Sequence, residues 1–161
     1  MADVLILDCG DDIKGECLLD AYKNKIELTS FSHGVAQAIT GDPSNQKRTA
    51  GKPNHSDFNV SKYLDLASCT LIDRCNQGTV IPSVKVIVGQ TEKDKITPII
   101  IYEMTDALIS SISQGGGGGK PQETLTFNYA KIKWDYTAQK SDATDAGKTS
   151  AKWSLLSNKA E

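Results

Sequence analysis

The sequence predicts a mainly β protein, either a β-barrel or a two-sheet sandwich, with about eight or nine strands and one helix at about residues 68–77. Apolar and polar residues alternate from Glu123 to Tyr136, which is typical of a strand with one buried face. The apolar positions change phase after Tyr129, and this predicts a bulge or bend where the strand passes from one sheet to the next. At ~3.3 Å per residue such a strand would span roughly 45 Å, so it belongs to a barrel or a sharply coiled sandwich.

Composition is that of an ordinary globular chain. The 161 residues are 39% hydrophobic and carry a net charge of −2, which predicts a single domain over residues 1–161 and argues against a nucleic-acid partner. The small basic group Lys47, Arg48 and Lys52 has no aromatic neighbour and is interpreted as part of a solvated loop. No apolar run is long enough to insert in a membrane, and the first residues indicate a strand and no signal peptide. We therefore expect folding in the cytoplasm.

The first half of the chain contains strands and one long polar segment. Val4–Asp8 is the first expected strand, and Gly15 is expected at a bulge or a close backbone approach. Residues 26–39 are β-like with an interruption at Gly34. Residues 40–57 hold four glycines and prolines and almost nothing apolar, so we expect a long extended loop there.

The second half contains the helix and the remaining strands. Ser68 is the expected N-cap of the helix and Gly78 its C′ glycine, with Leu71 and Cys75 on the apolar stripe. Further strands are expected at residues 58–63, 84–88, 96–104, 107–113 and 152–156, and a flexible polar segment at 140–150.

No catalytic, cofactor-binding or metal-binding residues are predicted. His33, beside Phe31, is interpreted as a packed or interface imidazole and His55 as a solvated one. The four cysteines lack zinc-ligand spacing and are expected to be buried, reduced thiols. Five consecutive glycines, 115–119, precede Lys120, but Pro121 stands where a phosphate-binding loop needs Ser or Thr, so a flexible hairpin loop is expected.

Several motifs in order along the chain resemble the haemolysin-coregulated protein (Hcp) family, the inner-tube proteins of bacterial type VI secretion. The resemblance runs nearly from end to end. It is carried by Lys14-Gly15-Glu16, Ser30-Phe31-Ser32-His33-Gly34, Phe58, Lys62-Tyr63-Leu64-Asp65, the helix with Leu71 and Cys75, Ile109-Ser110-Ser111-Ile112-Ser113, the glycine run, Leu125-Thr126-Phe127-Asn128-Tyr129-Ala130, Asp135-Tyr136 and Gln139.

The resemblance implies a structural protein that is not an enzyme. It implies hexameric rings that stack into a secreted tube, with sheath, spike and small effector proteins as partners and export without a signal peptide. Because the chain stops at Glu161, we expect a member without a toxin extension. Ser30 and Ser32 alternate with Phe31 and His33 and are the candidate lumen-facing residues. The loop is the candidate ring-stacking or interface segment, with Asp42, Gln46, Lys47, Arg48, Lys52 and His55 as its candidate contact residues.

Two other functions remain open at this stage. A free-standing secreted β-barrel that binds a carbohydrate or peptide would need an exposed aromatic platform, yet most aromatic residues fall in alternating strands, with Trp153 the exception. A small hydrolase would need a nucleophile–base pair, and the sequence offers none that can be placed.

Overall fold

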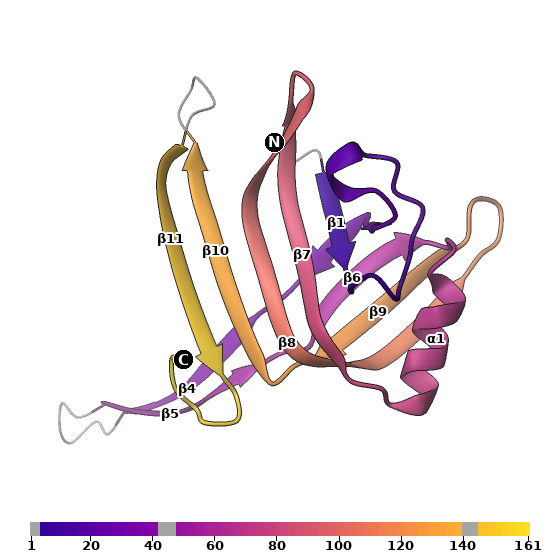
Figure 1. Ribbon diagram of the computed structural model, residues 1–161. Coiled ribbons are helices and arrows are strands. Elements are labelled where there is room, and N and C mark those ends of the chain that lie inside the picture. The colour runs from indigo at the N-terminus through magenta and orange to yellow at the C-terminus, as the bar shows by residue number, and fades with distance from the viewer. Residues whose placement is uncertain (1–3, 42–47, 140–144) are drawn as a thin grey trace.

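A computed structural model describes residues 4–41, 48–139 and 145–161 (Figure 1). It contains eleven strands over this part of the chain, two or three more than expected, together with one α-helix and a short 3-10 turn. The elements are β1 (Val4–Asp8), η1 (Asp20–Tyr22), β2 (Ile26–Glu27), β3 (Ser30–Ser32), β4 (Val35–Gly41), β5 (Arg48–His55), β6 (Phe58–Tyr63), α1 (Ser68–Gln77), β7 (Ile81–Glu92), β8 (Lys95–Gly115), β9 (Gln122–Asn128), β10 (Lys131–Gln139) and β11 (Asp145–Ser154).

Nine strands form one antiparallel sheet that folds into two layers. The path runs β2-β1-β7-β8-β9-β6-β3, and β10 and β11 extend it from the other side of β8. One layer holds β11, β10, β7, β1 and the first half of β8, and the second half of β8 continues into the layer with β9, β6 and β3 (Figure 1). The layers do not close into a barrel. Of the two predicted architectures, the two-sheet arrangement is therefore the correct one.

The strand that passes between the layers is β8, and this corrects the sequence-based assignment. β8 spans 21 residues where two separate strands were expected. It pairs with β7 up to Ala107 and with β9 from Leu108, next to a left-handed Asp106 (φ 51°) and a register shift after Ile109. The expected single strand from Glu123 to Tyr136 is instead β9 and β10, which lie in different layers. The phase change marks the break between two strands.

The core lies between the two layers. Phe58, Val60, Leu125 and Phe127 from β6 and β9 meet inward residues of β1, β7, β8 and β10, all of them at most 1% exposed: Leu7, Val84, Val86, Met104 and Ile132. Burial of this apolar surface is the main stabilising contribution to the fold.

Helix α1 packs beside this core through Leu71, which is fully buried. Gly78 ends the helix as expected, with a left-handed backbone (φ 60°) and an N–H that donates to the Cys75 carbonyl. The expected N-cap is wrong by one residue. Ala67 is the N-cap, and Ser68 is the first helical residue and is buried.

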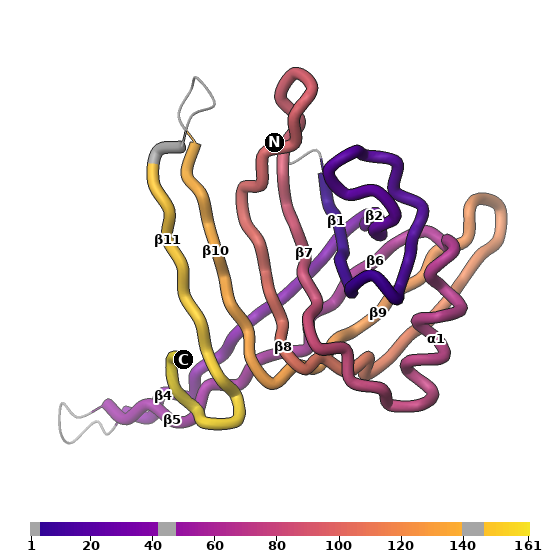
Figure 2. Tube along the Cα trace, in the orientation of Figure 1, coloured from indigo at the N-terminus to yellow at the C-terminus, as the bar shows by residue number. Residues whose placement is uncertain are grey.

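The predicted extended loop is a β-hairpin. β4 and β5 pair with each other in a separate two-stranded sheet, which projects away from the body (Figures 1 and 2). Every residue of β4 is exposed. The segment was assigned as a loop because a strand that is solvated on both faces shows no apolar alternation. The same reasoning explains β11, which begins at Asp145 inside the segment expected to be flexible.

The close approach expected at Gly15 is confirmed. A Cβ atom there would lie 2.5 Å from the Lys25 carbonyl oxygen, and the Gly15 N–H donates to the Asn24 carbonyl. The chain from Gly15 to Lys25 thus folds back on itself against β1, and only a residue without a side chain fits.

Candidate functional site

A continuous row of small polar side chains covers the outer face of the second layer. Strand register places Ser30, Ser61, Thr124 and Ser113 side by side across β3, β6, β9 and β8. The next row is Ser32, Asn59, Thr126 and Ser111. We call these eight residues the hydroxyl face.

The hydroxyl face follows directly from strand alternation. Residues between its members point the other way, so Phe31 packs against Phe58 and Tyr102, and Val60 and Leu125 are buried in the core. Ser30 and Ser32 are exposed, as expected from their alternation with Phe31. The other six members could not be predicted from the sequence, because their side-by-side placement depends on the pairing of distant strands. Whether this face lines a channel stays a prediction.

The hydroxyl groups form hydrogen bonds along the face. The Thr126 hydroxyl lies 2.6 Å from that of Ser110 and 2.7 Å from that of Ser111. At the margin, the Asp57 carboxylate accepts hydrogen bonds from Ser110 (2.6 Å) and Asn128 (3.0 Å). None of the eight residues is charged, so the face can offer weak, adaptable hydrogen bonds to many partners.

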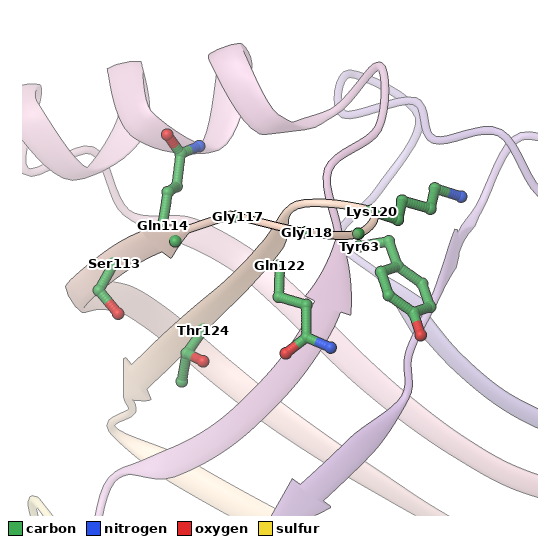
Figure 3. Close-up of a pocket in the computed structure, with 11 residues that line it drawn as sticks. Tyr63, Ser113, Gln114, Gly117, Gly118, Lys120, Gln122 and Thr124 are labelled. Carbon is green, nitrogen blue, oxygen red and sulfur yellow. The ribbon is translucent and has the colours of Figure 1, made fainter.

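An open pocket of about 610 Å³ continues the hydroxyl face at the β8–β9 loop (Figure 3). Backbone of the five glycines forms one wall, and polar side chains line the rest: Ser113, Gln114, Gln122, Thr124, Tyr63 and Lys120. The Lys120 ammonium lies 5.0 Å from the Tyr63 ring centroid, a cation–π distance. The glycine run joins two antiparallel neighbours, so the predicted hairpin loop is confirmed. The pocket lining offers hydrogen bonds and one cation, and it contains no histidine, cysteine or carboxylate to serve a nucleophile.

A buried ionic cluster lies on the other side of the same strands. Lys62 donates to Glu123 (2.7 Å), Asp65 (2.9 Å) and Ser68 (3.1 Å), and Ser68 donates in turn to Glu123 (2.9 Å). The side chains of Lys62 and Glu123 are 0% exposed. The cluster ties the start of α1 to β6 and β9. Sequence reasoning missed it, although a signal was present: Lys62 follows Phe58 and Val60 in the inward phase, and Glu123 precedes Leu125 in it.

Two imidazoles lie where the hairpin meets the body. His33 stacks on Phe58 (5.2 Å between ring centroids), and His55 stacks on Trp134 (6.2 Å). The packed position predicted for His33 is confirmed. The solvated position predicted for His55 is wrong, because β5 brings it back to the aromatic cluster. Burial lowers the pKa of both imidazoles, and the neighbouring His55 lowers that of His33 further.

The other predicted contact residues lie on the hairpin. Arg48 and Lys52 are exposed on β5, and Asp42, Gln46 and Lys47 fall outside the described residues. Of the cysteines, Cys9 and Cys17 are buried as expected, whereas Cys69 is exposed on α1. Over residues 4–41, 48–139 and 145–161, no group of three or more His, Cys, Asp or Glu is placed to hold a metal ion. The same residues contain no helix with the length and apolarity to cross a membrane.

Comparison with known proteins places the chain in a family. The family model described as "Type VI secretion system effector, Hcp" matches residues 7–136. Protein hcp1 of Pseudomonas aeruginosa is 29% identical over 150 residues, which cover 91% of this chain and 92% of the relative.

Solved structures agree with this result. A structure described as a type six secretion system protein superposes with a TM-score of 0.90 at 29% identity, over 98% of this chain and 99% of the other. A type VI secretion system effector from Yersinia pestis gives 0.75 at 26% identity, over 94% and 99%.

The fold and the family match therefore define this chain as a type VI secretion protein. The chain belongs to the Hcp family, as the resemblance in its sequence indicated, and it is a structural component of the type VI secretion tube.

Proposed function

We propose that the chain forms hexameric rings that stack into the inner tube, that the hydroxyl face lines the central channel, and that small effector proteins are carried against it. The observation that carries this proposal is the hydroxyl face itself: eight uncharged polar side chains in two registered rows across four strands. A channel that must hold and later release different cargo requires weak polar contacts, and large apolar or charged surfaces would retain it too tightly.

The projecting hairpin supports the assembly part of the proposal. A two-stranded sheet without a covering layer is only marginally stable in water. Contact with another subunit would therefore stabilise β4 and β5. The apolar side chains of Val35 and Ile39 are 50% and 64% exposed on it. A ring needs two different complementary patches on each subunit, and stacking needs a second such pair. We assign Arg48, Lys52 and His55, with Asp42, Gln46 and Lys47, to the ring-stacking or interface segment.

Secretion without a signal peptide, through contacts with sheath and spike proteins, is part of the same proposal. It rests on membership of a secreted family and requires no catalysis by this chain. A free-standing ligand-binding module is the alternative, and it predicts a monomer.

Light scattering after size exclusion, with negative-stain images of the same peak, tests the assembly. A mass near six times 17.4 kDa and rings with an open centre are expected. A monomer over a wide concentration range would contradict the tube assembly and favour the binding module.

A second experiment tests which face lines the channel. Ser32→Cys in a Cys69→Ser background is labelled with a small gold cluster, and the label is located in ring images. Ser150→Cys is the matched control, because it is also an exposed strand serine but lies on β11 in the other layer. Central gold for Ser32→Cys and peripheral gold for Ser150→Cys are expected. Peripheral gold at both positions would refute the channel assignment while leaving the ring intact.

A further inference from the structure

Among the described residues, the hairpin meets the body at a small root. We define the hairpin root as His33 and Gly34 on the incoming strand and His55 and Ser56 on the outgoing one. The Ser56 hydroxyl lies 3.0 Å from the Gly34 N–H and 2.9 Å from the Gly34 carbonyl, and the Ser56 N–H donates to the same carbonyl (3.0 Å). These hydrogen bonds join the two strands at the base of the hairpin.

The two imidazoles pack this root against aromatic rings of the body. His33 and His55 lie 6.3 Å apart between ring centroids, and both contact Tyr129 and Trp134. The Tyr129 hydroxyl donates to the Ser56 carbonyl (3.2 Å), so it has its lone pairs left for the His33 Nδ1–H at 3.4 Å. That arrangement assigns the neutral Nδ1–H form to His33 and leaves its Nε2 bare.

One further nitrogen on each imidazole has no acceptor for an added proton. His33 Nε2 and His55 Nδ1 are buried, and neither has a hydrogen-bond partner among the described residues. A proton added at either atom creates a buried N–H without an acceptor, which costs the desolvation of that group. Two imidazolium ions 6.3 Å apart would also repel each other.

We propose that the hairpin root is a pH-sensitive hinge, which holds the hairpin in a fixed orientation on the body when both imidazoles are neutral and releases it when they are protonated.

The surrounding groups do not supply the missing acceptor. The Asp57 carboxylate already accepts hydrogen bonds from Ser110 and Asn128 at the margin of the hydroxyl face. Lys152 lines the same groove between the hairpin and β11 as His55, and its ammonium is a donor and not an acceptor. The Tyr102 and Tyr129 hydroxyls stay protonated because burial raises the pKa of both. The aromatic faces attract a cation, and this attraction offsets part of the penalty for two unsatisfied N–H groups.

The size of the response follows from linkage. The pKa of each imidazole is lower in the closed root than the ordinary value of about 6.5, so opening takes up protons below that pH. At about pH 5, protonation of each imidazole can raise the ratio of open to closed root by at most about 30-fold. At about pH 7.5 fewer than about one in ten imidazoles is protonated even in the open form, so the gain nearly disappears.

Backbone hydrogen exchange of the full-length protein tests the hinge at about pH 7.5 and pH 5, corrected for the intrinsic exchange rate. Segments that contain Gly34 and Ser56 should lose protection by about tenfold or more at the lower pH, whereas β7 should not. The control is the double variant His33→Phe with His55→Phe, which keeps two aromatic rings but cannot titrate. It should hold its protection at both pH values. His33→Phe alone should lose protection by a smaller factor than the wild type.

Four results would overturn the hinge. The first is equal protection of the wild-type root at both pH values, and the second is an equal loss in the double variant. The third is a root that is already unprotected at about pH 7.5. The fourth is titration of both imidazoles at or above their ordinary pKa, measured by exchange at the ring C2 position. The test needs no ring or tube, so it can fail or succeed separately from the proposed assembly.

Discussion

Replacing Lys62 with methionine removes the one cation from the buried ionic cluster while keeping an unbranched side chain in its place. The Glu123 carboxylate, whose side chain is 0% exposed, would then keep only its hydrogen bonds from Ser68 and Gln114. Breaking a buried ion pair from one side costs about 3–5 kcal/mol. With a urea m-value of about 2 kcal/mol/M, the midpoint of unfolding should fall by roughly 1.5–2.5 M.

A matched ion pair near the surface provides the control. Lys25 lies 2.9 Å from Asp8, and the two side chains are 21% and 26% exposed. Lys25→Met should therefore cost only about 0–1 kcal/mol. The double variant Lys62→Met with Glu123→Leu removes both buried charges, and we expect its stability within about 2 kcal/mol of the wild type. The two single losses should then be far from additive.

Urea unfolding followed by the fluorescence of Trp134 and Trp153 measures all four proteins. Protomer concentration is held constant, since assembly would shift the apparent midpoint by mass action. The reasoning fails if Lys62→Met costs no more than Lys25→Met, or if the double variant loses the sum of the single effects. Either result would mean that the cluster is solvated in the folded protein or that its charges are compensated elsewhere.

Three further outcomes are expected. Gly15→Ala should lower the melting temperature and destabilise the fold by about 1–3 kcal/mol, because its Cβ would overlap a backbone carbonyl. The control Gly119→Ala should be nearly neutral, because its Cβ would point into open space. Equal melting curves for the two variants would contradict this. Replacing residues 36–54 by a short link should leave the circular dichroism of the body but abolish stacking in electron micrographs, and unchanged tubes would rule out the hairpin as a stacking element. Cys69 should react at once with maleimide at about pH 8. Burial and the adjacent Asp8 carboxylate raise the pKa of the Cys9 thiol to about 12, so Cys9 should react only on unfolding; a fast phase that survives in the double variant Cys69→Ser with Cys75→Ser would disprove this order.

The sequence predicted strands best where one face is buried. β6 and α1 lie where expected, because Phe58 and Val60 alternate with polar residues and because Gly78 supplies the left-handed helix end. The bend was assigned to the wrong strand. A phase change looks the same whether a strand is kinked or broken, and only long-range pairing distinguishes β9 and β10 from one continuous strand.

The candidate site was harder to predict for two physical reasons. Ser30 and Ser32 could be chosen from local alternation, but the hydroxyl face depends on register across four strands, and register is a tertiary property. The polar composition of the hairpin hid both its strands and the return of His55 to the aromatic cluster. In the same way, periodicity counted over apolar residues alone passes over Lys62, a charged residue in an inward position.

The continuity of β8 has a mechanical consequence. This strand is hydrogen-bonded to β7 and β10 in one layer and to β9 in the other, so no loop separates the layers along its length. Antiparallel hydrogen bonds lie perpendicular to the strands. A load directed along β8 would therefore shear many of these bonds together and would not open them one after another. The body of the subunit should resist such a pull as a single stiff element, while the hairpin, whose described strands pair only with each other, remains the compliant part.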